Sequence, residues 1–288
     1  MRKYVAAAIC FLSGLTHLSA QLSPPNETGV SLGHLHYYVR DVEANARFWV
    51  ALGGEVTRVD TTTVVKFPDV LVFLSPGESL GGTEGSVVNH VAFRVKSLDA
   101  VEAAGFEFER PESFSGVTSV FTPEGERIEL FDETATNLTF RQDDGFDDPV
   151  ARRHNEPIRV PIIAHHIHLY LPAGAEQQAQ EWYTTMFGGT PGMRWRYTAT
   201  DLPGINFNFS DNPEHFDSTR GRMLDHIGLE VVNLEEFCRQ LSAKGIVFDK
   251  PYATSSMGLG SAFLTDPWGT YIALTEGLNE FYGVIWIG

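Results

Sequence analysis

The sequence predicts an α+β fold made of four similar βαβββ modules, and three observations support this prediction. First, a strand pattern with a His at its second residue occurs four times, as GHLHYYV, NHVAFRV, HHIHLYL and DHIGLEV. Second, each of these strands is followed by a stretch with apolar residues at helical spacing that ends at glycine. Third, the second and fourth modules align further, because GFEFERP at Gly105 matches GIVFDKP at Gly245.

Alternation within the four strands predicts which side chains share a face. Successive side chains of a strand point to opposite faces, so His90 shares its face with Arg94. The same parity places His34 with His36, and His166 with His168. These four strands therefore indicate mainly a repeated structural unit, and in addition a metal site.

Local signals predict the remaining elements of the first two modules. Asp41 is a good N-cap for a helix that stops at Gly53, and Ser97 is a good N-cap for a helix that stops at Gly105. The β-rich runs that follow are residues 55–58, 62–67 and 70–74 in the first module, and FEFER, TSVFT and RIELF in the second.

The third and fourth modules repeat this order with two differences. The third contains an aromatic-rich stretch through Trp195, Tyr197, Phe207 and Phe209, which either lines a cavity or belongs to the core. In the fourth, Asn233 and a Glu three residues later predict a capping box.

Composition divides the chain into regions. Residues 1–20 combine a basic start, an apolar run and small residues at the end, which predicts a secretory signal peptide and an exported protein, periplasmic or secreted. An uncleaved anchor is the alternative. Residues 30–135 and 160–280 are each predicted to form a domain of two consecutive modules, joined by a polar, solvated linker at 141–159. After cleavage Cys238 is the remaining cysteine, so no intramolecular disulfide is expected.

The charge of the chain limits its partners. The formal net charge is −16, which argues against nucleic acid or an anionic membrane as the main partner. The hydrophobic content of 43% and charged content of 20% are those of a soluble globular protein. The sequence leaves open the oligomeric state and whether modules pair within or between domains; a small-molecule substrate is expected only from the family resemblance described next.

The ends of the second and fourth modules complete a family resemblance. FTPEGERIEL at Phe121 matches LTDPWGTYIAL at Leu264. With four βαβββ units and a His at the head of each first strand, the chain resembles the vicinal oxygen chelate superfamily from about Gly33 to Gly277. This superfamily includes glyoxalase I, extradiol dioxygenases, and bleomycin- and fosfomycin-resistance proteins. The resemblance implies two cupped, barrel-like mixed sheets, each built by two modules around a site.

The resemblance also implies a set of metal ligands. They are the first-strand His of each paired module and a Glu on the last strand of the second, which gives His34, His90 and Glu129. Two imidazoles and one carboxylate suit Fe(II), Mn(II), Co(II) or Zn(II) and leave positions open for two adjacent substrate oxygens. Glu129 is also a candidate catalytic carboxylate.

The second domain departs from this pattern because Ala273 stands where Glu129 stands in the first. We expect the metal to be lost there, with a possible second site formed by His166, His168 and His226 as the alternative. His36 is a candidate proton carrier, or else a strand packing residue. Arg94 and Arg127 are candidates for binding a substrate carboxylate, with an ion pair at the sheet rim as the alternative for both.

Three functions remain open on the sequence. The first is a metal-dependent lyase or isomerase of the glyoxalase type, acting on a small molecule chelated through two oxygens. The second is an extradiol-type ring-cleaving dioxygenase, which GVTSVF (residues 116–121) disfavours because it lacks the Tyr and His that the family places there. The third is a non-catalytic binding or resistance protein. We favour the first because the ligand set is complete.

Overall fold

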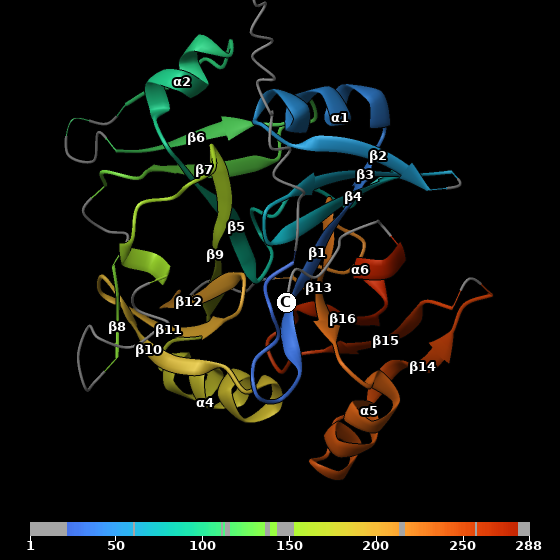
Figure 1. Ribbon diagram of the computed structural model, residues 1–288. Coiled ribbons are helices and arrows are strands. Elements are labelled where there is room, and N and C mark those ends of the chain that lie inside the picture. Colours follow the sequence, from blue (N-terminus) through green and yellow to red (C-terminus); the bar gives the residue numbers. More distant parts are fainter. Residues whose placement is uncertain are drawn as a thin grey trace, which may run out of the picture.

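The computed structural model describes residues 22–59, 61–110, 112, 116–135, 139–142, 153–212, 217–256 and 258–281. It contains two eight-stranded sheets of mixed strand direction with helices packed at their ends (Figure 1). The predicted α+β class and the repeated modules are therefore confirmed. The predicted signal peptide lies outside the described residues. Within the described part, no helix is both long enough and apolar enough to cross a membrane.

The first and second modules contain the following elements. The first consists of β1 (Val30–Val39), α1 (Val42–Ala51), β2 (Glu55–Val59), β3 (Thr62–Phe67) and β4 (Val70–Pro76). The second consists of β5 (Val88–Val95), α2 (Leu98–Ala103), β6 (Val117–Phe121) and β7 (Arg127–Asp132), followed by the short strand β8 (Phe140–Arg141).

The third and fourth modules follow the same order. The third consists of β9 (Ile162–Leu171), α4 (Glu176–Phe187), β10 (Thr190–Arg194), β11 (Tyr197–Leu202) and β12 (Ile205–Asp211). The fourth consists of β13 (Leu224–Val231), α5 (Leu234–Ala243), β14 (Phe248–Thr254), β15 (Gly260–Thr265) and β16 (Tyr271–Glu276), followed by α6 (Leu278–Phe281).

The pairing of modules differs from the prediction. One sheet has the order β14-β15-β16-β13-β1-β4-β3-β2, so it joins the first module to the fourth. The other has the order β6-β7-β5-β9-β12-β11-β10-β8, so it joins the second to the third. We name them the outer-module sheet and the inner-module sheet. The prediction that the first module shares a sheet with the second, and the third with the fourth, is wrong, since β1 pairs with β13 and β5 pairs with β9, both antiparallel.

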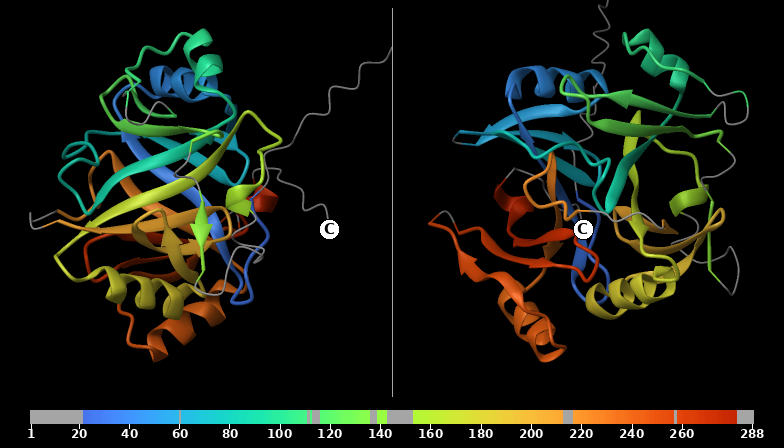
Figure 2. Two further views of the ribbon diagram at one scale, coloured as in Figure 1. Left: turned by 90° about the vertical axis from the view of Figure 1, so that its left-hand side faces the viewer. Right: turned by 180° about the vertical axis from the view of Figure 1, so that it is seen from behind.

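The two modules of each predicted domain instead pack face to face. The ring centroid of Phe93 in the second module lies 5.3 Å from that of Phe67 and 5.7 Å from that of Trp49, both in the first. In the other half, the Tyr183 hydroxyl donates to the Asp266 carboxylate at 2.9 Å. In Figures 1 and 2, α1 and α2 therefore lie at one end of the molecule and α4 and α5 at the other, with both sheets between them.

Local signals predicted some details well and others poorly. Asp41 caps α1 by accepting from the Ala44 amide, as predicted. The capping box at Asn233 is wrong, because the side chain of Asn233 makes no cap bond. The Glu276 carboxylate instead accepts from the backbone amides of Asn233 and Leu234, at 2.8 and 3.2 Å.

Two other segments depart from expectation. Residues 106–110, predicted as the strand FEFER, form no strand; the Thr118 hydroxyl donates to the Glu109 carbonyl at 2.6 Å, so a side chain replaces the ladder there. In the predicted solvated linker, His154 is 3% exposed and its Nε2 lies 2.5 Å from the Asp201 carboxylate. That part of the linker is buried against the inner-module sheet.

Candidate metal centre

Strand register in the inner-module sheet brings two histidines and a glutamate together. Antiparallel pairing of β5 with β9 sets Ala92 opposite His166 and His90 opposite His168. Parallel pairing of β5 with β7 sets Glu129 beside Ala92. The small side chain of Ala92 thus lies between His166 and Glu129, candidate metal ligands that come from two different modules.

The donor atoms of this ring converge closely. His90 Nε2 lies 3.1 Å from Glu129 Oε1 and 3.2 Å from His166 Nε2, and His166 Nε2 lies 3.6 Å from Glu129 Oε1. Two ligands held about 2.0–2.1 Å from one metal ion lie about 2.8–3.4 Å apart for angles between 90° and the tetrahedral value, and about 3.6 Å apart for an angle near 120°. The three spacings therefore fit one divalent metal ion, with the His166–Glu129 pair at the widest angle.

Electrostatics favour the protonation states that a metal requires. Burial, reinforced by the charge of Arg194, lowers the pKa of His166 well below its usual value, so its imidazole is neutral at neutral pH. Burial alone would raise the pKa of Glu129, but attraction to His90, Arg127 and Arg194 outweighs it and lowers that pKa. A neutral imidazole and an ionised carboxylate are the ligand forms that bind metal.

Neighbouring groups hold the rings in place. His90 Nδ1 lies 2.8 Å from Asn89 Oδ1 and 2.6 Å from a guanidinium nitrogen of Arg127, and His166 Nδ1 lies 2.9 Å from His165 Nδ1. These contacts occupy Nδ1 of both rings and leave each Nε2 facing the centre. His168, whose Nε2 lies 2.7 Å from the Ser210 hydroxyl, has a donor atom within 4.8 Å of those of His90 and His166.

The centre opens into a cavity of about 360 Å³. Its lining combines three arginines, Arg127, Arg194 and Arg196, with aromatic walls. Arg194 is 2% exposed and donates to Asn208 Oδ1 at 3.2 Å, and burial lowers its pKa to about 10, so it stays charged at neutral pH. The cavity therefore suits a small anionic molecule.

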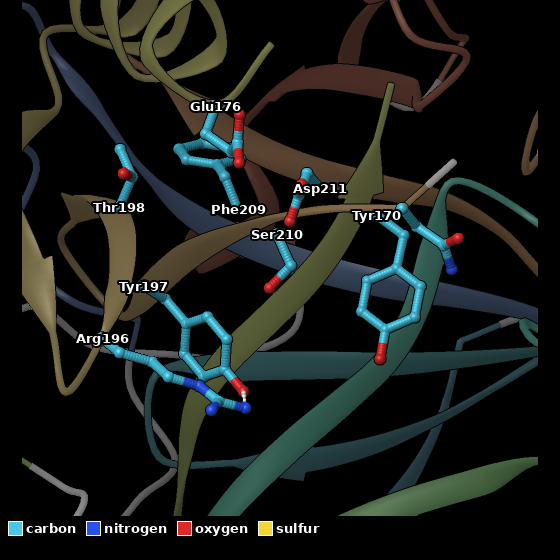
Figure 3. Close-up of a pocket in the computed structure, with 9 residues that line it drawn as sticks. Tyr170, Glu176, Arg196, Tyr197, Thr198, Phe209, Ser210 and Asp211 are labelled. Atoms are coloured by element: carbon cyan, nitrogen blue, oxygen red, sulfur yellow. Dashed lines mark hydrogen bonds between the residues drawn. The ribbon is translucent and has the colours of Figure 1, made fainter. Parts of the chain in front are cut away.

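A second cavity of about 380 Å³ adjoins the first (Figure 3). The two share Tyr170, Arg196 and Tyr197, and Figure 3 shows the rings of Tyr170 and Tyr197 in the cavity wall. Glu176 and Asp211 make its far side acidic. The pair of cavities provides a cationic part beside the centre and a mixed-charge part beyond it.

The structure corrects the predicted triad. His34 lies on β1 in the outer-module sheet, whereas His90 and Glu129 lie in the inner-module sheet, so the three do not form one site. His166 takes the place assigned to His34, because β5 pairs with β9 and not with β1. The grouping of His166 and His168 with His226 is wrong for the same reason.

The arginines near the centre were predicted only in part. Arg127 lines the cavity, but Arg94 does not; it is 3% exposed and donates to the His154 carbonyl at 3.1 Å. Sequence reasoning missed Arg194 and Arg196, although both flank Trp195 in the aromatic-rich stretch. The sequence signal that could have identified them is an arginine on each side of an aromatic residue.

The outer-module sheet carries a second histidine cluster. His34, His36 and His226 have donor atoms that all lie within 4.8 Å of one another. His36, predicted as a proton carrier for the first site, belongs to this cluster. Ala273 lies beside Gly228 in the register that sets Glu129 beside Ala92, so this cluster lacks the carboxylate.

Comparisons with known proteins agree with this fold. Residues 153–274 match the family model described as the Glyoxalase/Bleomycin resistance protein/Dioxygenase superfamily. Glyoxalase I from Zea mays has a similar structure, with a TM-score of 0.63 and 14% identity over 88% of this chain and 95% of that one. A Bacillus subtilis protein provisionally described as a dioxygenase has a TM-score of 0.56 and 13% identity over 89% of this chain and 86% of that one.

No curated protein matches the chain by sequence. At these identities the structural likeness shows the fold alone, which covers both sheets, whereas the family model covers the third and fourth modules. Together they confirm the resemblance to the vicinal oxygen chelate superfamily, with its glyoxalase- and dioxygenase-like members.

Proposed function

We propose that the protein is a divalent-metal-dependent enzyme that acts on a small, oxygen-rich anion, by lyase or isomerase chemistry of the glyoxalase type. The observation that carries the proposal is the convergence of His90, His166 and Glu129 at a cavity lined by three arginines. A metal bound there supplies Lewis acidity toward two adjacent substrate oxygens.

The residues of the chain have separate roles in this proposal. Arg127, Arg194 and Arg196 attract and orient the anionic substrate, and the aromatic wall excludes water from it. Chemistry of this type moves a proton between neighbouring carbon atoms. The ionised Glu129 carboxylate and the neutral His168 ring are the groups placed to accept that proton, since burial lowers the pKa of His168 well below its usual value.

Ring-cleaving dioxygenation is the second candidate. Two histidines and one carboxylate form the ligand set that suits Fe(II) and oxygen chemistry. His168 and Tyr197, whose ring centroids lie 4.6 Å apart, line the same cavity and provide the His and Tyr missing from residues 116–121. This pair of residues favours the dioxygenase, which the sequence of residues 116–121 alone had disfavoured.

Metal reconstitution followed by a substrate screen tests the proposal. Protein stripped with a chelator is reloaded with Fe(II), Mn(II), Co(II) or Zn(II) and assayed with thiol adducts of 2-oxoaldehydes and with catechols. Turnover of the adducts without oxygen consumption supports the lyase or isomerase. Oxygen uptake with catechols supports the dioxygenase, and no turnover with any metal by protein that binds metal favours a binding protein.

Variants then assign the site. Glu129→Ala should abolish turnover while circular dichroism stays unchanged, and Glu55→Ala, an exposed carboxylate in the other sheet, is the matched control. Full activity in Glu129→Ala would refute the assignment.

We also propose export of the protein, and an N-terminus at Gln21 in the mature protein would verify cleavage of the signal peptide.

A further inference from the structure

We propose that His34, His36 and His226 form a second metal site that prefers Zn(II) and binds it through three imidazole nitrogens. This site lies in the outer-module sheet and is separate from the centre described above. It does not use the ligand pattern of the first site, because no carboxylate stands among its three donors.

Backbone register builds the cluster and one glycine makes room for it. Pairing of β1 with β13 sets His36 opposite His226 and His34 opposite Gly228. A Cβ atom at residue 228 would lie 2.0 Å from the Nδ1 and Cε1 atoms of His34, far inside van der Waals contact. The corresponding residue of the other sheet is Ala92, so Gly228 is what allows the His34 ring to take its place.

Each ring has a nitrogen left over for a metal. His226 Nδ1 lies 2.6 Å from Asp225 Oδ2, which leaves Nε2. His36 Nε2 lies 2.8 Å from the Ser75 hydroxyl, which leaves Nδ1. His34 is 4% exposed, and its Nδ1 has no hydrogen-bond partner among the described residues. A buried polar atom without a partner is costly unless something binds it.

The two sites place their negative charge differently. In the inner-module sheet the carboxylate is that of Glu129, beside His90 Nε2, and the partners of His90 Nδ1 are the neutral Asn89 and the guanidinium of Arg127. In the outer-module sheet Ala273 replaces the ligand, and the partner of His226 Nδ1 is the carboxylate of Asp225. A carboxylate that accepts from the far nitrogen makes an imidazole a stronger metal donor.

A cation also lies near this cluster. The ammonium of Lys250 lies 4.3 Å from the centre of the Phe263 ring, and that ring centroid lies 5.3 Å from the centroid of the His226 ring. The carboxylate of Asp225 is in direct contact with the cluster, since its Oδ2 lies 2.6 Å from His226 Nδ1.

Ligand chemistry selects the metal. Imidazole nitrogens suit Zn(II), and also copper, iron and nickel ions, whereas Mg(II) and Mn(II) prefer carboxylate, carbonyl and water oxygens. Three histidines with a position open to water form a known type of zinc site. The inner site, with its carboxylate ligand, should bind Fe(II) and Mn(II) in addition, so the two sites should differ in metal preference.

Titration of metal-free protein tests the second site without any activity assay. The variant His90→Ala/His166→Ala removes the first site, and Zn(II) is titrated against it in competition with a chromophoric chelator. We expect wild type to bind two equivalents and this variant to bind one. Adding His36→Ala should remove the remaining equivalent, and Asp225→Asn should weaken it about 10- to 100-fold. Co(II) should give visible absorption with the variant, and Mg(II) should not compete.

The outcomes separate this proposal from the proposed function. A folded His90→Ala/His166→Ala variant that binds no Zn(II) would overturn the second site and leave the first untouched. Zn(II) retained in full after His36→Ala would overturn the ligand set. If the double variant does not fold, His36→Ala in the otherwise unchanged protein gives the same test: the two bound equivalents should fall to one, and two retained equivalents would overturn the second site.

Discussion

The two sheets have the same strand register around their centres but different residues at a few key positions. His90 and His168 in one sheet correspond to His226 and His36 in the other, since both pairs lie opposite each other across the two antiparallel first strands. The hydrogen bonds from His168 to Ser210 and from His36 to Ser75 are equivalent as well. The backbone thus presents imidazoles in both sheets in the same way.

Three differences lie on the last strands of the modules. Glu129, Arg127 and Asn208 of the inner-module sheet correspond in register to Ala273, Tyr271 and Phe73 of the outer-module sheet. Each change replaces a charged or polar group by a less polar one. On the first strands, Asp225 in turn replaces Asn89 beside the corresponding histidine, so both strands set the charge around the imidazoles.

The largest effect should come from the paired variants His166→Ala and His34→Ala. His166→Ala removes an inner-site ligand, so turnover should fall by more than about 100-fold, beyond what loss of an outer-shell partner costs. His34→Ala should leave turnover within about twofold, because His34 lies in the other sheet. Steady-state kinetics on both variants, with circular dichroism as the check on folding, measures this contrast. The reverse order of effects would place catalysis in the outer-module sheet.

Arg194→Met should lower kcat/KM for an anionic substrate by about 10- to 150-fold, the range for loss of one hydrogen bond to a charged group. The loss should appear mainly in KM, because the proposal assigns Arg194 to substrate binding and not to the metal. Arg220→Met, in the turn that precedes β13 and with a side chain 54% exposed, is the matched control. An unchanged KM for Arg194→Met would show that the buried guanidinium has only a structural role.

Ala273→Glu tests whether one carboxylate distinguishes the two sites. It should raise the affinity of the outer site for Mn(II) by about tenfold or more, since a charged oxygen ligand suits that ion. Manganese electron paramagnetic resonance on the His90→Ala/His166→Ala background would measure it. Ala273 is fully buried, so Ala273→Gln controls for the added volume. Equal Mn(II) binding by both variants would mean that charge is not the deciding difference.

Gly228→Ala should have the smallest and most local effect. The added Cβ displaces the ring of His34, so Zn(II) affinity at the outer site should fall by about tenfold, comparable to losing an outer-shell partner. Inner-site turnover should not change. Ala92→Gly, the reciprocal change in the other sheet, serves as the control, and a normal Zn(II) affinity in Gly228→Ala would show that His34 is not a ligand.

The sequence by itself determined the modules and the chemical nature of their key residues. Period-two alternation, the glycine stops and the cap at Asp41 are local signals, and they predicted the elements because local backbone preferences act within a few residues. Motif matching also identified His90 and Glu129 as ligand candidates and Ala273 as a lost one. These conclusions required no knowledge of which module lies beside which.

Only the tertiary structure decided the partners. The first strand of one module could pair with that of another in more than one way, because the backbone edge of a strand carries little sequence information. The alternation of apolar and polar residues in each module fits pairing within a predicted domain and pairing between domains equally well. The pairing of β5 with β9 therefore replaced His34 by His166 in the site and gathered His34, His36 and His226 in the other sheet. Arg194 became a cavity residue for the same reason, since β10 belongs to the sheet that holds Glu129.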